Sequence, residues 1–544
     1  MDHAGVGQGS PSLEPQAKAV DIAPIARPPS RGEKPTWDDG YPLAPSRRLW
    51  AAVVLFAATT MVALDMTVAN VAVPHIAGNT GASLEQGTWV VTSYAIAEAI
   101  AMPLTGWLVG RLGAVRLHLL AMAGFTLFSL LCGLSLTLPM LVICRVGQGL
   151  CGGPIIPLSQ ILTYRIFPSR QLAKVMAYWM LVMTITPAVG PIMGGAIADA
   201  VSWHWIFLIN IPIGLAGMAL SYVLLRPAET NRVRNPVDRV GLVLLVMWVG
   251  ALQLLLDTGR DKDWFADWSI VGLATVAGIG FCAFVIWELT EEHPMVDLKL
   301  LRNRPYALCV IGTAVSYCAY FCSIVIVPQW LQTAMGYSAI QAGYVTAASA
   351  LFALFASQAS IQLMLRIDAR IVATMGGLWV AVCVLVRTLW STDFDMFHLA
   401  LIFGLQGLGT NMMHLPLNSM AVNALTQEET AAGTGLLNFV RTMAAAMGAA
   451  VALTFWANQQ AVSRDALVQS LHADQAASTL SGLGLSPSTQ AAYFGALVDR
   501  QAATVGMLHT FAVVGVATLI TAMSIWLIPH VELKRLRGKR DDVH

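Results

Sequence analysis

Three ionisable side chains lie inside long apolar stretches of the sequence. Asp65 and Glu98 fall in the first two of these stretches, and Arg145 falls in the fourth. An unpaired charge at the centre of a bilayer costs at least about 2.5 kcal/mol. Each group therefore needs a partner or a wet cavity, and an acid can also escape the cost by taking up a proton. We interpret Asp65, Glu98 and Arg145 as candidate proton-coupling residues.

Each of these interpretations has a structural alternative. Glu98 could line a wet cavity without titrating during transport, and Arg145 could be a hub of structural hydrogen bonds. We regard Asp65 as the strongest candidate for a proton carrier.

Other polar and aromatic side chains within the apolar stretches are suited to contact a hydrophobic substrate. Amide, imidazole, indole and guanidinium groups on such helices also hydrogen-bond neighbouring helices, so helix packing is the alternative for each. The candidate substrate contacts are Asn70, Gln160, Gln329, Trp330, Asn411, His414, Asn438 and Arg441.

The sequence contains no pattern typical of an enzyme, a cofactor site or a channel. We find no metal-ligand cluster, nucleotide-binding loop, paired nucleophile and base, or filter-like repeat. Cys318 and Cys322 are four residues apart but have no His or carboxylate nearby, so packing explains them better than metal binding. We expect no enzymatic activity, metal or cofactor.

The composition requires that these residues be held by membrane helices. The 544 residues are 56% hydrophobic and 12% charged, with a mean hydropathy of +0.64, whereas soluble domains carry about 25% charged residues. A net charge of +1 gives no indication of a nucleic-acid partner. We predict an all-α protein in contact with membrane lipid, with fourteen spans at residues 49–73, 88–110, 117–136, 139–163, 175–198, 204–225, 238–257, 269–288, 306–330, 339–364, 370–390, 397–421, 433–456 and 507–529.

The distribution of basic residues predicts the orientation. Loops and the C-terminal tail on one side carry about 21 Lys and Arg, against about four on the other, and basic loops stay in the cytoplasm. We therefore expect both termini in the cytoplasm. A Pro-rich polar segment before the first span should be a disordered tail.

An internal repeat indicates two related halves. Gln148-Gly149-Leu150 in the fourth predicted span matches Gln406-Gly407-Leu408 in the twelfth, and Pro-Leu follows both triplets. Repeats of this kind are typical of secondary transporters. The separation of eight spans fits six-helix halves with two extra spans between them. The predicted segments are a tail at 1–46, a first half at 47–226, two extra helices and linkers at 227–298, a second half at 299–531 with a periplasmic segment at 457–506, and a tail at 532–544.

A glycine-rich turn follows the second span. Gly106, Arg111 and Gly113 stand in it, where small residues permit close helix approach and the arginine can stay in water. The turn resembles the loop motif of the major facilitator superfamily, although Gly110 replaces its acid and residues 114–115 replace its basic pair. The charge relay that this family runs through the loop is thereby in doubt.

A second glycine motif lies in the fifth span. Gly190, Pro191, Gly194 and Gly195 combine a small-residue face with a missing backbone donor, which suits a helix that packs closely and bends. The pattern resembles the antiporter motif of drug exporters in this superfamily, with Thr186 where the leading glycine would stand.

Further segments resemble the EmrB branch of the fourteen-span drug:proton antiporters. They are residues 86–89, 157–160, 203–207, 210–214 and 435–441, and Asp65 fits the first-span motif of these antiporters. The resemblance implies a major facilitator fold and proton-driven export of hydrophobic or amphipathic compounds across the bacterial inner membrane. It also implies a periplasmic EmrA-like adaptor and an outer-membrane TolC-like channel. A dedicated exporter of one metabolite or siderophore is the alternative.

Overall fold

The computed structural model describes residues 42–529, apart from 231, 233–235, 260–261, 263, 427 and 471–486. This part of the chain is built of helices, with no strand. The first half comprises α1 (Pro45–Thr80), α2 (Leu84–Ala101), α3 (Thr105–Leu112), α4 (Ala114–Gly133), α5 (Leu138–Gly152), α6 (Ile155–Ile166), α7 (Ser169–Ala200), α8 (His204–Leu208) and α9 (Asn210–Leu225). The C-terminal tail and most of the N-terminal tail lie outside the described residues.

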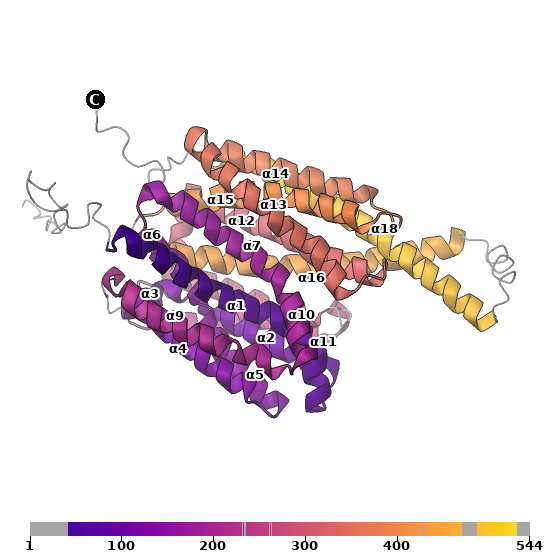
Figure 1. Ribbon diagram of the computed structural model, residues 1–544, viewed down its shortest axis with the longest axis horizontal. Helices are drawn as coiled ribbons and strands as arrows, with labels where there is room; N and C mark the ends of the chain where they lie inside the picture. The colour runs from indigo at the N-terminus through magenta and orange to yellow at the C-terminus, as the bar shows by residue number, and fades with distance from the viewer. Residues whose placement is uncertain are drawn as a thin grey trace, which may run out of the picture.

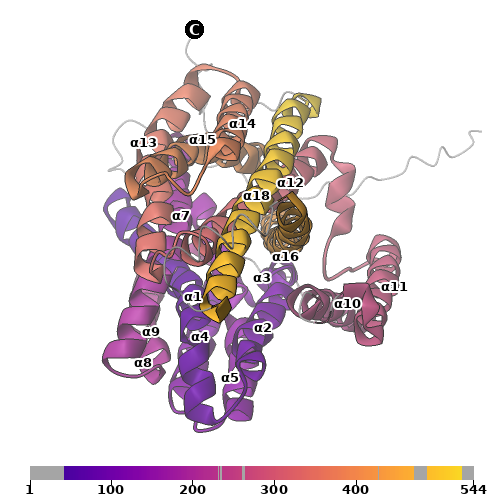
Figure 2. The ribbon, with the colours of Figure 1, turned by 90° about the vertical axis from the view of Figure 1, so that its right-hand side faces the viewer.

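Two helices separate this half from the second. They are α10 (Arg239–Thr258) and α11 (Trp268–Thr290), which pack on each other and lie at one side of the molecule (Figure 2). The second half comprises α12 (Arg304–Thr333), α13 (Ala339–Arg366), α14 (Ala369–Val386), α15 (Met396–Asn423), α16 (Thr430–Ser470) and α18 (Pro487–Ser524). The prediction of an all-helical membrane protein is confirmed.

The number of spans is not confirmed. Within the described residues, eleven helical segments are long and apolar enough to cross a membrane, and the bent pair α2 and α3 is a twelfth if it forms one span. The other two predicted spans coincide with α7 and α15, of 32 and 28 residues. At about 1.5 Å per residue both are long enough to cross, but polar residues such as Gln406, Asn411 and His414 lower the hydropathy of α15.

Equivalent helices of the two halves begin with the same local structure. Ser83 and Gln86 form a capping box at the start of α2, and Ser338 and Gln341 form one at the start of α13. In each, the serine side chain and the glutamine side chain satisfy backbone amides that the first helical turn leaves free.

The apolar core shows where the halves meet. Both chain ends of the described helices lie at one end of the bundle, where α1 begins and α18 ends, which we call the terminal end (Figure 1). One large core cluster there combines residues of both halves, such as Ile161 and Leu436. At the far end the second half and the first half have separate clusters. The halves are therefore packed together at the terminal end and separate towards the far end.

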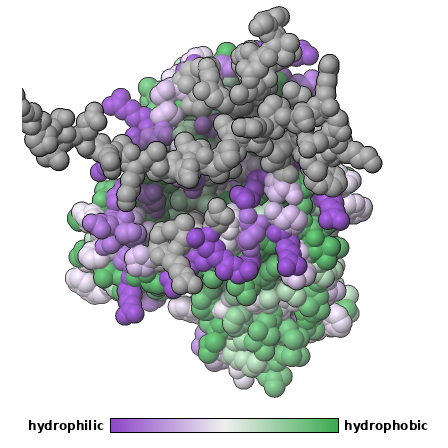
Figure 3. Space-filling view, turned by 90° about the vertical axis from the view of Figure 1, so that its left-hand side faces the viewer, coloured by the Kyte–Doolittle hydropathy of each residue, from purple (hydrophilic) through white to green (hydrophobic). Residues whose placement is uncertain are grey.

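The terminal end has a more hydrophilic surface than the flank of the bundle. Hydrophilic side chains gather on it, whereas apolar side chains cover the flank below them (Figure 3). This contrast is expected where a helix bundle leaves the hydrocarbon layer.

Candidate functional site

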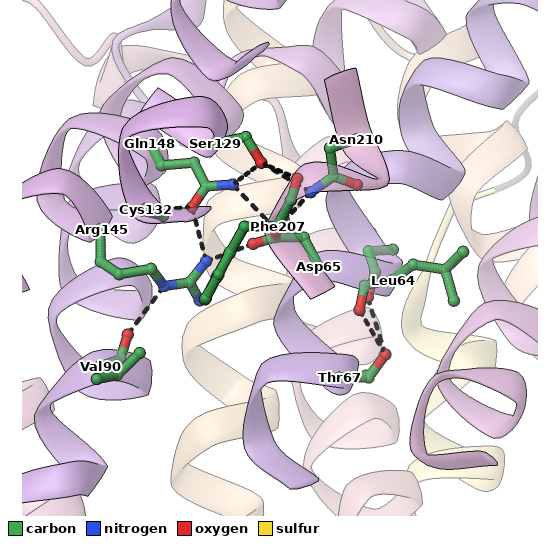
Figure 4. Close-up of polar contacts among 11 residues, drawn as sticks. Leu64, Asp65, Thr67, Val90, Ser129, Cys132, Arg145, Gln148, Phe207 and Asn210 are labelled. Atoms are coloured by element: carbon green, nitrogen blue, oxygen red, sulfur yellow. Dashed lines mark hydrogen bonds and ion pairs between the residues drawn. The ribbon is translucent and has the colours of Figure 1, made fainter. Parts of the chain in front are cut away.

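Asp65 lies at the centre of a buried polar cluster in the first half (Figure 4). Its Oδ2 forms an ion pair with Nη1 of Arg145, and both side chains are fully buried. Its Oδ1 accepts hydrogen bonds from Nε2 of Gln148 at 2.9 Å and from Nδ2 of Asn210 at 2.7 Å. Charge-assisted hydrogen bonds of this kind stabilise an ionised carboxylate in a buried site. In the observed conformation both carboxylate oxygens of Asp65 thus have partners.

Four helices supply this cluster. Asp65 comes from α1, Arg145 and Gln148 from one face of α5, Asn210 from the start of α9 and Ser129 from α4. The Ser129 hydroxyl accepts from Gln148 at 3.2 Å and from Asn210 at 3.0 Å, and donates to a backbone carbonyl at 2.9 Å. A change in the charge of Asp65 therefore reaches four helices at once.

Arg145 is restrained on several sides. Its Nε donates to the backbone carbonyl of Val90 on α2 at 2.9 Å, and its Nη1 also donates to Gln148 Oε1 at 2.8 Å. The guanidinium lies 4.1 Å from the ring centroid of Tyr94, a cation–π contact. Its Nη2 has no hydrogen-bond partner within the described chain. Nη2 is therefore available to donate to another group when the cluster rearranges.

A cavity of about 210 Å³ reaches the cluster between α1, α7 and α9. Asp65 and Asn210 form part of its lining, and Ala57, Leu64 and Ile213 belong to its apolar walls. Every lining residue comes from the first half.

Glu98 is buried without the partners that Asp65 has. It is 5% exposed, and no hydrogen bond or salt bridge to its carboxylate occurs among the described residues. The charges of Arg145 and Arg441 both act on it electrostatically. The helix that carries it packs closely on α5, since a Cβ on Gly153 would lie 2.6 Å from the Glu98 carbonyl oxygen.

Several predicted substrate contacts meet where the two halves face each other. Nδ2 of Asn438 on α16 donates to Oε1 of Gln160 on α6 at 2.6 Å. Arg441 lies between the ring of Trp179 on α7, at 5.6 Å, and the ring of Tyr317 on α12, at 5.3 Å. We call Gln160, Trp179, Asn438 and Arg441 the interhalf cluster. It joins α6 and α7 of one half to α16 of the other.

His414 lies beside this cluster. Its ring stacks on Tyr317 with 4.3 Å between the centroids, and it is 4% exposed. Its Nε2 has no partner in the described residues. Through Tyr317 it contacts the same aromatic surface as Arg441.

The structure places the remaining predicted contacts elsewhere. Trp330 is buried in the core of the second half, where its indole donates to Thr504 Oγ1 at 3.0 Å. Asn411 bonds the Ser357 hydroxyl on α13 at 2.8 Å, a contact within one half. Gln329 is half-buried and Asn70 is exposed, and neither joins the interhalf cluster. Substrate contact by these four stays a prediction.

Comparison with known proteins agrees with this geometry. Residues 55–449 match the model of the Major Facilitator Superfamily. The chain belongs to the major facilitator superfamily. It is 37% identical over 466 residues to the multidrug export protein EmrB of Escherichia coli K12, a match that covers 85% of this chain and 91% of that protein. It is 35% identical over 496 residues to the fatty acid resistance protein FarB of Neisseria gonorrhoeae, a match that covers 90% of this chain and 97% of that protein.

Solved structures share the fold. The human organic anion transporter MFSD10 (TETRAN) gives a TM-score of 0.53 at 13% identity and covers 87% of this chain and 100% of its own. A double-tryptophan mutant of XylE gives a TM-score of 0.54 at 14% identity, and the match covers 90% of this chain and 98% of that structure. The chain is thus a multi-pass transporter of the major facilitator superfamily and not an enzyme, and the predicted EmrB-type resemblance is confirmed.

The antiporter-type glycine motif of this major facilitator protein packs α7 onto α1. A Cβ on Gly190 would lie 1.9 Å from Thr67 Oγ1, and one on Gly194 would lie 2.9 Å from the carbonyl oxygen of Val68. Gly195 is half-buried on the same helix, which also contains Pro191. The close approach occurs two to three residues after Asp65, so the glycines position the helix that carries the acid.

The superfamily loop motif is held by an acid that the sequence analysis missed. The Glu229 carboxylate accepts the backbone amides of residues 115 and 116 at 3.0 and 3.1 Å. Gly113 has a φ of +88°, and a Cβ there would lie 2.4 Å from Glu229 Oε1. Gly106 packs on α16, where its Cβ would lie 2.6 Å from Ala432 Cα, and Arg111 lies over the Trp107 ring at 5.3 Å.

Sequence reasoning also missed Ser129, Gln148 and Asn210 as members of the Asp65 cluster. Gln148 carried a signal, because it opens the repeated triplet whose second copy begins at Gln406. Gln406 Oε1 in turn accepts a hydrogen bond from Nη2 of the fully buried Arg387, at the end of α14. Asn210 also carried a signal, because it opens the EmrB-like segment 210–214. Ser129 carried none, since a single serine in a membrane helix is usually a packing residue.

Proposed function

We propose that this protein is a proton-driven multidrug exporter of the bacterial inner membrane. The buried pair of Asp65 and Arg145 supports the proposal most strongly, because a buried acid lies opposite a buried cation in a cluster drawn from four helices of one half. The similarity to proteins named for multidrug export supports the substrate class. The terminal end, which carries most of the basic loops, would face the cytoplasm.

Proton uptake by Asp65 would act through its partners. Protonation removes the negative charge opposite Arg145, so the guanidinium loses its counter-ion and the bonds from Gln148 and Asn210 weaken. A proton can drive a conformational change only if the two conformations differ in their affinity for it. The observed conformation surrounds the Asp65 carboxylate with the donors of Arg145, Gln148 and Asn210. Glu98, which has no such bonds, is the second proton-coupling candidate.

The substrate would bind between the halves. Gln160, Asn438 and Arg441 supply polar groups, and Trp179, Tyr317 and His414 supply aromatic faces, a combination typical of sites for amphipathic molecules. The halves are packed together at the terminal end in the observed conformation. Opening that end requires breaking the bond between Gln160 and Asn438.

Transport in proteoliposomes tests this proposal directly. An imposed pH gradient should drive accumulation of a fluorescent amphipathic cation, and adding the compound should in turn move protons. Protein inserted in both orientations is distinguished by a protease site placed near the C-terminus. Accumulation that persists after the pH gradient is collapsed with an ionophore would contradict proton coupling.

We further propose that helices α16 and α18 bind a periplasmic adaptor that connects to an outer-membrane channel. The two helices extend together beyond the bundle at the far end (Figure 1). Arg464 pairs with Asp499 at 2.7 Å, and Trp456 donates to the carbonyl of Ala503 at 2.9 Å. Apolar side chains on this extension are exposed, including Val462 at 63% and Tyr493 at 52%. An unpaired apolar surface on a helical hairpin fits a helical partner.

Surface variants of the extension test this assembly. Val462→Ser with Tyr493→Ser should lower whole-cell resistance but leave transport into inverted vesicles intact, because vesicle transport requires no outer-membrane channel. Asp499→Asn is the matched control on the same hairpin and should change neither whole-cell resistance nor vesicle transport. Equal losses in cells and vesicles would show that the hairpin serves transport itself.

A dedicated exporter of one metabolite or siderophore is the second candidate. One relative at 35% identity is named for fatty acid resistance, and Arg441 offers a cation that could bind a carboxylate between the halves. Competition transport separates the two functions. Inhibition of accumulation by chemically unrelated compounds supports multidrug export, whereas inhibition by a single chemical class supports a dedicated exporter.

A further inference from the structure

A second cavity lies at the terminal end of the first half, apart from Asp65 and from the interhalf cluster. It has a volume of about 340 Å³ and lies where α4 begins and α9 ends. Its lining consists of Val115, Arg116, Leu119, Tyr222, Arg226 and Glu229. The transport mechanism proposed above uses none of these side chains.

The two arginines of this cavity are not strongly paired with carboxylates. Arg226 is exposed, its guanidinium lies 5.8 Å from the ring centroid of Tyr222, and it forms no salt bridge within the described chain. The Arg116 side chain is 62% exposed, and its Nε lies 3.9 Å from Glu229 Oε2, a long ion pair. Both guanidinium groups can therefore still bind an anion.

The one acid in the lining is already occupied. The Glu229 carboxylate accepts the backbone amides of Val115, Arg116 and Thr230 at 3.0, 3.1 and 3.0 Å. Its charge thus serves to cap the first turn of α4. It competes little with a second anion for the outer N–H groups of the arginines.

The surface beside the cavity is apolar. Leu120 of α4 is 59% exposed, and Leu220 and Val223 of α9 are 50% and 65% exposed. A basic pocket with an aromatic ring therefore adjoins a lipid-facing flank. Free phosphate would gain nothing from this flank, whereas acyl chains would cover it.

We propose that Arg116 and Arg226 bind the phosphate headgroup of an anionic phospholipid. The acyl chains lie along α4 and α9, and Tyr222 lies at the level of the headgroup. Bidentate donation by arginine suits phosphate oxygens. The bound headgroup would hold Arg116 against Glu229 and so stabilise the turn between α3 and α4. Helix α3 also contacts α16 through Gly106.

Lipid retention by the purified full-length protein tests this site. Native mass spectrometry with phosphatidylglycerol and phosphatidylcholine of matched chains should show preferential retention of phosphatidylglycerol. Arg116→Gln with Arg226→Gln should reduce that preference about 25-fold, at roughly fivefold for each basic residue. Arg239→Gln, at an exposed arginine that begins α10 outside the cavity, is the matched control and should leave the preference unchanged.

The other outcomes overturn the proposal. An unchanged preference in the double variant would place the lipid elsewhere, and an equal loss in Arg239→Gln would indicate general surface charge. If inorganic phosphate displaces phosphatidylglycerol from the wild type at equal concentration, the site binds the free ion and the lipid assignment is wrong. The measurement requires no transport, so its failure would leave the proposed export function untouched.

Discussion

Arg145 of the first half and Arg387 of the second are both completely buried, but the two arginines have different surroundings. Arg145 of the first half faces the Asp65 carboxylate, with Gln148 beside it. Arg387 of the second half donates to Gln406 and lies 4.5 Å from the ring centroid of Phe403. No carboxylate pairs with Arg387 in the described residues, and its Nε and Nη1 have no partner there.

The two halves share a repeated framework but differ in the groups around the buried arginine. Both halves keep a glutamine at equivalent positions, and each glutamine oxygen accepts a bond from a buried arginine. Among the described residues, only the first half places a carboxylate against its buried arginine. We therefore expect proton coupling to depend on the first half, with Arg387 serving the packing of the second.

Removing the acid of the first half should have the largest effect. Asp65→Asn keeps the shape of the side chain but mimics the protonated acid, so the variant should bind drug yet fail to build a gradient in response to an imposed pH gradient. Drug-induced proton release should fall as well. Proteoliposome transport measures both, and Asp65→Glu should retain partial activity.

Because Asp65→Asn leaves a buried cation unpaired, its folding needs a separate check. A monodisperse, drug-binding variant that still builds the gradient would move the coupling site away from Asp65. Glu98→Gln would then be the next variant to examine, since Glu98 is the other buried acid near Arg145.

The two arginines should differ in what their loss does to stability. Arg145→Gln leaves the Asp65 charge buried without its counter-ion, which costs about 3–5 kcal/mol. Arg387→Gln leaves no charge behind and loses chiefly one hydrogen bond and the cation–π contacts of the guanidinium, about 1–2 kcal/mol. Thermal unfolding in the same detergent compares them. Equal destabilisation would mean that Arg387 also has a buried counter-ion.

The close contact of α7 with the helix that carries Asp65 should tolerate no added methyl group. Gly190→Ala places a Cβ against Thr67 Oγ1, so overpacking should cost about 1–3 kcal/mol and reduce transport. Gly278→Ala on α11 is the matched control, because a Cβ there has no neighbour within 4 Å. Transport rate and melting temperature are measured for both, and a similar loss in the two variants would argue against a specific contact.

Two asparagines of the second half allow the finest comparison. Asn438 bonds Gln160 across the halves, whereas Asn411 bonds Ser357 within one half. Asn438→Ala should shift the conformational equilibrium away from closure at the terminal end by about fivefold, the equivalent of one hydrogen bond near 1 kcal/mol. Asn411→Ala should lower stability without that shift. Spin-label distances across the terminal end report the populations, and an identical shift in both would make the interhalf bond irrelevant to closure.

The sequence by itself determined where the helices run and which ionisable groups lie inside apolar stretches. Hydropathy over about 20 residues is a local property, so most spans could be located. The predicted spans at α7 and α15 are not among the helices apolar enough to cross, and polar residues lower the average of α15. Burial of Asp65, Glu98 and Arg145 followed from their positions in apolar stretches and is confirmed. The glutamine triplets indicated the repeat, because equivalent helices of the two halves keep similar local patterns.

Only the tertiary structure decided which of these groups meet. Asp65 and Arg145 are 80 residues apart, and Asn210 joins them from 145 residues away. Such pairings depend on helix crossing angles and on close contacts such as Gly190 with Thr67, which no window of sequence contains. The same reason explains the position of Trp330, which packing places in the core of the second half. The cost of burying a charge can be foreseen from the sequence, whereas the partner that offsets it depends on how the helices pack.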